Sequence, residues 1–209
     1  MSSDESTFDP NSFIHSIKFP EASDRLFVSA SDWRNNARLD WSWDKWSLYT
    51  DGYKEAAGIL VKQIEVGARG AVQDTLVYPI VFLYRQYLEL AIKALLKDAR
   101  RLQDIEKAFP THHRIYDLWL DCRALLKEIC PGDSEKELDQ ITRLIKEFSS
   151  IDPDSFAFRY PEDKKGKPTI EGLTHLNLRV LRETMDGISN LLSGAHCQIS
   201  THLDYKADM

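Results

Sequence analysis

The residues of this chain that could do acid–base chemistry lie on or beside two predicted helices. Arg85 and Glu89 are four residues apart and can pair along one helix face, and Lys93 extends the same polar stripe by one turn. His112 and His113 stand where a further helical segment begins, and backbone N–H groups and the helix dipole favour an anion at such a position. An Arg, a His and a helix start that meet in one pocket would be chemically suited to a phosphate.

Seven residues are therefore candidates for a functional site. The catalytic candidates are His113, Arg85 and Glu89, and the ligand-binding candidates are Arg159, Tyr160, His112 and Lys93. Four of these seven residues have a structural alternative. Arg85 with Glu89 can tie a helix into its packing, since such pairs often fix structure without activity. His113 can cap its helix, and Arg159 can brace its loop by binding backbone carbonyls.

Several familiar catalytic motifs are absent. The sequence has no G-x-G-x-x-G, Walker loop, G-x-S-x-G or H-E-x-x-H, which argues against dinucleotide binding, P-loop hydrolysis, hydrolase-elbow catalysis and zincin chemistry. Asp152 and Asp154 are spaced like a pair of metal ligands, but the sequence DPDS is also a common turn. A metal ion could be bound by His196, Cys197 and His202, but the sequence offers no fourth ligand beside them. We therefore expect no metal and no cofactor.

The segment 79–96 predicts a helix that is apolar nearly all round. At 100° per residue its polar stripe fills an arc of about 100°, and apolar side chains fill most of the remainder. Such a helix lies in the centre of a bundle or between two subunits. We expect it to begin a few residues before Pro79 and to fade through 97–101.

Four further segments have the apolar spacing of amphipathic helices. Their expected bounds are about 50–66, 109–129, 134–148 and 174–193. Gly67 and Gly194 end the first and last of them, and Ser134 to Glu137 has the pattern of a capping box. The segment 151–171 contains three prolines and alternating aromatic residues, which predict a loop or small hairpin with a basic tip at 164–167. The sequence thus predicts an all-α bundle of about five helices, with that loop or hairpin between the last two.

We expect residues 1–40 to form a partly mobile N-terminal arm, 41–193 the bundle and 194–209 a C-terminal tail. Four of the five tryptophans lie at positions 33–46. We interpret them mainly as large rings that pin a non-helical segment to the bundle, since each hides considerable area for little side-chain entropy. The alternative is a stacking surface for nucleic-acid bases, which usually needs interleaved basic residues as well.

Composition limits the class of protein. The chain has 209 residues, 43% of them hydrophobic, and a formal charge of −6, which argues against a protein that coats nucleic acid through bulk electrostatics. Its three cysteines are an odd number without metal spacing, as in free thiols of a reducing cytoplasm. No apolar run approaches the roughly 20 residues of a membrane span. We therefore expect a cytoplasmic protein without membrane contact.

Three stretches together resemble a known superfamily. FLYRQYLELAIKALL, then THHRIYDLW, then IDPDSFAFRYPEDKKGKP are similar to the HEPN superfamily of all-α domains linked to nucleotide or RNA biology, and within it to a prokaryotic branch of uncharacterised proteins. The resemblance covers about 41–192 and implies a bundle that dimerises through its central helices. Many relatives are metal-independent ribonucleases of toxin–antitoxin pairs, CRISPR effectors or phage defence.

This sequence departs from the superfamily in two respects. The ribonuclease members have an Arg followed by a His after four to six residues, and this spacing is absent; Arg114 also stands where the branch usually has Asp. Two hypotheses follow from the resemblance. The first is a homodimer that recognises RNA or a nucleotide, in the fullest case as a metal-independent endoribonuclease of bacterial defence. The second is a non-catalytic interaction or adaptor module of such a system, working with a protein from the same operon.

Overall fold

The computed structural model describes residues 18–67, 70–130 and 135–209 of the chain. The chain divides into two compact units, of which the first ends at Trp41 and the second runs from Ser42 to Met209. Over the described ranges it contains five α-helices, one short 3₁₀ helix and no strand. The predicted all-α class with five helices is confirmed.

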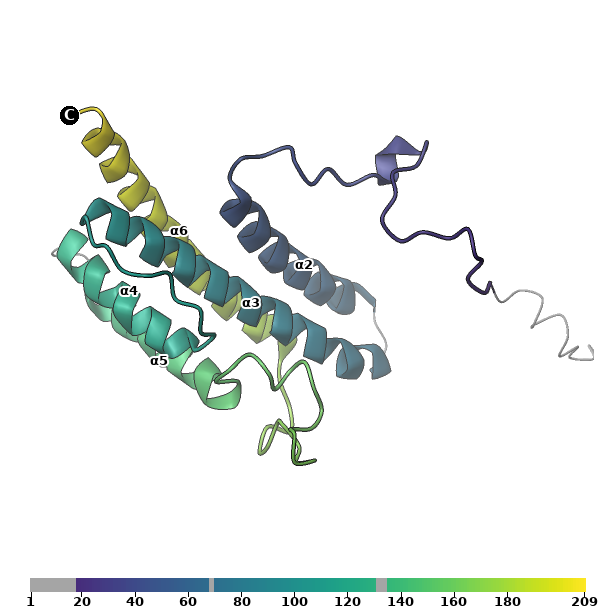
Figure 1. The fold of residues 1–209 in the computed structure, drawn as a ribbon. Coiled ribbons are helices and arrows are strands. Elements are labelled where there is room, and N and C mark those ends of the chain that lie inside the picture. The colour runs from purple at the N-terminus through teal and green to yellow at the C-terminus, as the bar shows by residue number, and fades with distance from the viewer. Residues whose placement is uncertain (1–17, 68–69, 131–134) are drawn as a thin grey trace, which may run out of the picture. The chain divides into compact units, whose positions relative to one another are not determined.

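Most helices of the second unit pack against one central helix, α3 (Ala71–Leu102). The helices of this unit are α2 (Lys45–Gly67), α3, α4 (Ile115–Ile129), α5 (Glu135–Ile151) and α6 (Leu178–Ala207), shown in Figure 1. Helix α3 packs against α2, α4 and α6, and α5 packs against α4. The apolar surround of α3 is therefore accounted for by neighbours within the same chain, as expected for the central helix of a bundle.

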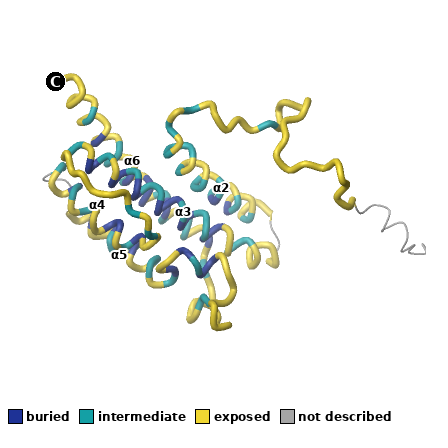
Figure 2. The backbone as a smooth tube through the Cα atoms, viewed as in Figure 1, coloured by how far each residue is buried: buried dark blue, intermediate teal, exposed yellow. Residues whose placement is uncertain are grey.

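Buried residues recur along most of α3 (Figure 2). The fully buried core side chains include Ile80, Leu88, Ile92 and Leu95 from α3, Leu118 and Trp119 from α4, Ile145 from α5 and Met185 from α6. The indole N–H of Trp119 donates to Thr142 Oγ1 at 2.8 Å, which ties α4 to α5 at a partly buried position. None of the helices within the described ranges has the length and apolar character that a membrane span needs.

The first unit is described from residue 18 onward. It contains the 3₁₀ helix η1 (Trp33–Asn35), and the side chain of Asn36 exchanges two hydrogen bonds with the backbone of Ala30. The guanidinium of Arg34 lies over the Trp33 ring at 5.6 Å from its centroid. Residues 1–17 of the predicted arm lie outside the described range.

Helix α2 begins five residues before the predicted start at Thr50. Its first turn is capped by Asp44, whose Oδ1 accepts from the backbone N–H of Ser47 at 3.2 Å. The hydrogen bonds from Ser47 also hold the pKa of Asp44 below its ordinary value. Its described part runs to Gly67, and residues 68–69, where the predicted end would be tested, lie outside the described residues. The capping box predicted for α5 begins at Ser134, outside the described residues.

The prediction that a helix opens at 109–111 was wrong. Residues 103–114 form a non-helical connection between α3 and α4, here called the connector, and α4 begins only at Ile115. Pro110 disfavours a helical backbone at the residue before it. The carbonyls of Ala108 and His113 accept side-chain N–H groups of arginines on α3 rather than helical amides. These contacts satisfy two carbonyls of the connector without helical hydrogen bonds.

The segment after α5 is a loop built from turns, as predicted in outline. One isolated antiparallel bridge joins Glu162 and Pro168 and closes the basic tip. The strand-like alternation at 156–160 does not produce a strand, because Asp152 Oδ1 accepts from the N–H groups of Phe156 and Ala157 and folds that stretch into turns. The bonds are 2.6 and 3.0 Å long.

The last helix differs most from the prediction. We expected 174–193, with Gly194 as its end and a frayed tail over 194–209, but α6 starts after an Asn177 cap and runs through Gly194 to Ala207. Burial of the later turns explains the difference. Ile199 is fully buried, and Nε2 of His196 lies 3.0 Å from Oδ2 of Asp98 on α3. These contacts outweigh the cost of about 1 kcal/mol for a glycine inside a helix.

Replacing Gly194 by Ala should stabilise the protein by about 0.5–1 kcal/mol, because the residue is helical and an added Cβ meets nothing within 4 Å. Denaturant unfolding measures the change. Gly166→Ala is the matched control and should destabilise, since Gly166 has φ +74°. A destabilised Gly194→Ala protein would contradict the continuous helix and support a helix end there.

Candidate functional site

The guanidinium of Arg85 is fully buried and joins three parts of the chain. Its Nη1 donates to Oε2 of Glu89 at 3.3 Å, on the same helix. Its Nη2 donates to the backbone carbonyl of His113 at 2.5 Å, and Nε donates to the carbonyl of Asp152 at 3.4 Å. Arg85 therefore holds both the connector and the loop after α5 against α3.

The carboxylate of Glu89 is the shared partner of the polar side chains around it. It is 2% exposed, and its Oε1 accepts from Nζ of Lys93 at 2.9 Å and lies 2.8 Å from Nδ1 of His113. Burial by itself would raise the pKa of Glu89, but the hydrogen bonds from Lys93 and His113 outweigh it and hold the pKa below the ordinary value. Glu89 is therefore a buried anion.

His113 is the part of this group that reaches the surface. Its side chain is 58% exposed, although Nδ1 is held by the buried carboxylate of Glu89. An ionised carboxylate only accepts hydrogen bonds, so Nδ1 carries the proton and Nε2 of the neutral ring carries a lone pair. Among the described residues Nε2 has no hydrogen-bond partner. A carboxylate that orients an imidazole in this way presents a base to a bound molecule.

Buried charges of opposite sign balance around Glu89. Arg85 and Lys93 are the cations, and Glu89 and Asp152 are the buried carboxylates. Burial lowers the pKa of Arg85, and the negative charges of Glu89 and Asp152 oppose that effect. Asp152 is 1% exposed, and its Oδ2 has no hydrogen-bond partner among the described residues. We call Arg85, Glu89, Lys93 and His113 the Glu89 cluster.

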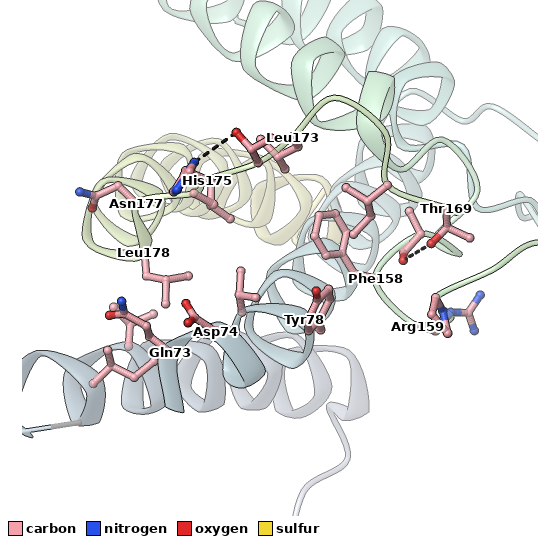
Figure 3. A pocket seen from close by; sticks show the side chains of 18 of the residues that line it. Gln73, Asp74, Tyr78, Phe158, Arg159, Thr169, Leu173, His175, Asn177 and Leu178 are labelled. Atoms are coloured by element: carbon pink, nitrogen blue, oxygen red, sulfur yellow. Dashed lines mark hydrogen bonds between the residues drawn. The ribbon is translucent and has the colours of Figure 1, made fainter. Parts of the chain in front are cut away.

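The two predicted loop residues lie in a different place. Arg159 and Tyr160 line a groove of about 1020 Å³ that runs between the loop after α5, the end of α2 and the start of α3 (Figure 3). None of the residues of the Glu89 cluster lines this groove. The structure therefore separates the predicted single site into the Glu89 cluster and the groove.

Arg159 braces its loop, which is the structural alternative considered for it. Its Nε donates to the carbonyl of Ser155 at 2.5 Å, and its guanidinium lies 5.9 Å from the Phe82 ring and 5.8 Å from the Tyr160 ring. Tyr160 in turn stacks on Phe156 at 4.6 Å between ring centroids. Ser155 has φ +60°, in the left-handed region, and the turn held by Asp152 fixes this conformation.

Two predicted ligand-binding residues have other surroundings than expected. Lys93 is 6% exposed and bound to Glu89, so it neutralises this buried carboxylate and is not free to bind a ligand. His112 has a buried Nδ1 without a partner among the described residues, and it makes no hydrogen bond to the Glu89 cluster. His113, the N-terminal neighbour of the α4 cap residue Arg114, binds Glu89 rather than capping the helix.

Sequence reasoning found one structural part played by Asp152, its turn, and missed the other, the contact of its carbonyl with Arg85. We weighed it as a metal ligand or a turn residue, and the structure shows it folding the loop through two backbone N–H groups while its carbonyl accepts from Arg85. The sequence DPDS carried that turn signal. Over the described ranges, no three His, Cys, Asp or Glu side chains come together in a way that could hold a metal ion.

The tryptophans also behave differently from one another. Trp46 packs on Phe109 of the connector with 5.3 Å between ring centroids, and Nζ of Lys97 lies 5.8 Å from the Trp46 ring. Trp46 lies within helix α2 and not in a non-helical segment, so this contact differs from the pinning role predicted for the group. Trp43 is 96% exposed and pins nothing. Trp33 and Trp41 belong to the first unit, whereas Trp43 and Trp46 belong to the second.

Comparisons with protein-family models, with curated proteins and with solved structures returned no match. The two sites are therefore interpreted from their own geometry and chemistry.

Glu89→Gln should lower the free energy of unfolding by about 3 kcal/mol at neutral pH. The substitution keeps the shape of the side chain but leaves the buried charges of Arg85 and Lys93 without their shared anion. Urea unfolding followed by circular dichroism measures the loss. Glu128→Gln, at an exposed position of α4, is the matched control and should change the value by less than about 0.5 kcal/mol.

The pH dependence gives a second measurement of the same carboxylate. Because the pKa of folded Glu89 lies below its ordinary value of 4.5, its charge stabilises the fold above that pH, and the stabilisation is lost as the pH falls through the lower, folded pKa. The difference in stability between wild type and Glu89→Gln should therefore shrink from about pH 6 to about pH 3. A difference that stays constant over this range would show that Glu89 is not a stabilising anion.

Proposed function

We propose that this protein recognises RNA or a nucleotide at His113 and cleaves RNA without a metal ion. The observation that carries the proposal is an exposed imidazole whose Nδ1 lies 2.8 Å from the buried carboxylate of Glu89. That arrangement orients a base toward solvent, where a substrate can reach it. The resemblance to HEPN ribonucleases supports the choice of RNA over other substrates with an acidic proton.

The chemistry assigned to His113 is removal of a proton from a ribose 2′-hydroxyl. The 2′-oxygen then attacks the adjacent phosphorus, the bond to the 5′-oxygen breaks, and that oxygen takes up a proton as it leaves. The products are a 2′,3′-cyclic phosphate and a 5′-hydroxyl. Glu89 holds the reacting ring in one tautomer, and Arg85 and Lys93 keep Glu89 ionised. In this scheme Arg85 and Glu89 are positioning residues, since both are buried.

The proposal includes a homodimer. Proton removal and proton donation call for two groups, and His113 is the only member of the Glu89 cluster that is exposed. A second copy placed with its own His113 nearby would supply the other group. The HEPN resemblance supports this arrangement, together with a cytoplasmic role in bacterial defence or a toxin–antitoxin pair.

One observation favours a different function, that of a non-catalytic adaptor. Two of the three hydrogen bonds of Arg85 go to backbone carbonyls, so much of the cluster acts as a latch for the connector and the loop. A latch needs no substrate. In that case the exposed surface of the bundle would bind a partner protein, for example one encoded in the same operon.

The decisive variant is His113→Asn. The Asn amide nitrogen can occupy the position of Nδ1 and keep the bond to Glu89, but nothing replaces the outer ring nitrogen. If His113 is the base, cleavage of single-stranded RNA in EDTA should fall at least about 100-fold while the melting temperature changes little. Gel analysis of a labelled oligonucleotide measures the rate.

His202→Asn, at an exposed position of α6, controls for the loss of a histidine and should keep the wild-type rate. Equal cleavage by wild type and His113→Asn would remove His113 from the mechanism. A wild-type dimer that neither binds nor cuts RNA would favour the adaptor.

A further inference from the structure

A second, smaller hollow lies where α3 ends and the connector begins. Its volume is about 240 Å³, which at about 30 Å³ for each water corresponds to about eight water molecules. The four cationic side chains of Lys97, Arg100, Arg101 and Lys107 line it, together with the ring of Phe109. Among the described residues no carboxylate lines the hollow, which is unusual in a chain with a formal charge of −6.

The end of α3 does not account for these cations. Basic side chains often compensate the free carbonyls at the C-terminus of a helix. Here the last carbonyls of α3 already accept from the backbone N–H groups of Gln103, Asp104 and Ile105 and from Nζ of Lys206. Neither Lys97 nor Arg101 pairs with a carboxylate of the described residues. Lys97 lies over the Trp46 ring, a contact that leaves its positive charge without a counter-ion in the described part of the chain.

Arg100 provides a preformed set of donors at the wall of the hollow. It is 7% exposed, and its Nη1 donates to the carbonyl of Ala108 at 3.2 Å. Its Nη2 and the Nζ of Lys107 share the carboxylate of Asp121, at 3.4 and 3.2 Å. The lining carries four positive charges, and two of these share the one carboxylate of Asp121. Such a wall is built to attract an anion.

Phe109 adds an aromatic surface to this positive wall. Its ring lies 5.8 Å from Nζ of Lys93 and 5.3 Å from the Trp46 ring, and both contacts hold it in place. The residue is still 44% exposed and lines the hollow. A fixed, open aromatic ring beside a phosphate-sized positive site is the combination that recognises a base with its phosphate.

We propose that this hollow binds the phosphate of a nucleoside monophosphate, with its base against Phe109. The phosphate would accept from Lys97, Arg100 and Arg101. The volume has room for about one such unit and not for an oligonucleotide. This site goes beyond the function proposed above, because neither Glu89 nor His113 lines the hollow.

Calorimetric titration of the full chain with AMP, ribose 5-phosphate and inorganic phosphate tests the assignment. The double variant Lys97→Ala/Arg101→Ala should weaken AMP binding at least about tenfold, because it removes charged donors to the phosphate. The matched control Lys62→Ala/Lys146→Ala removes two exposed lysines elsewhere and should leave binding unchanged. Phe109→Leu keeps an apolar side chain and should weaken AMP about tenfold while ribose 5-phosphate is unaffected.

His113→Asn keeps the hollow intact and should bind AMP as wild type does. The variant therefore distinguishes a failure of the nucleotide site from a failure of the ribonuclease proposal. Loss of AMP binding in His113→Asn would overturn the assignment by moving the nucleotide to His113. Equal affinity of AMP and inorganic phosphate, or equal weakening by both double variants, would overturn it as well. Absence of AMP binding at millimolar concentration would exclude the site.

Discussion

The burial of one carboxylate, that of Glu89, is the constraint on which the rest of the bundle depends. A charge in the centre of a helical core is costly unless it is paired and fully hydrogen-bonded. Glu89 meets this condition with three donors: two lie one helical turn away on either side, and the third comes from the connector. The third donor matters most, because it fixes a segment without regular structure onto α3.

The same constraint separates buried from reactive groups. In the sequence alone, a stripe of polar residues along a central helix has the pattern of a functional site. Once α2, α4 and α6 cover α3, most of that stripe is used to satisfy its own members and nearby backbone carbonyls. The residue that reaches solvent is His113, which lies outside the stripe and is bound by it. Reactivity at this site would therefore be an indirect product of core electrostatics.

Much of the fold followed from periodicity, whereas the errors came from long-range contacts. The apolar spacing in 79–96 predicted a central helix, and its place between three other helices agrees. Spacing could not show that arginines would take the carbonyls of 108 and 113 and keep the connector from becoming helical. Nor could it show that Asp98 and the core would carry α6 past Gly194. For the site, the i, i+4 pattern correctly predicted that Arg85, Glu89 and Lys93 lie together. It could not predict that Arg159 lies apart from them, because that separation depends on tertiary packing.

The irregular connector is held through its peptide groups as well as through side chains such as His113 and Phe109. Arg85 and Arg100 donate to its carbonyls, and Lys206 donates to the Leu102 carbonyl where it begins. Every amino acid offers the same carbonyl, so these contacts make few demands on the side chains of the segment they hold. Positions such as Ala108, which take part only through the carbonyl, can accordingly change while the path of the connector stays constant, which lets surface specificity diversify on an unchanged scaffold.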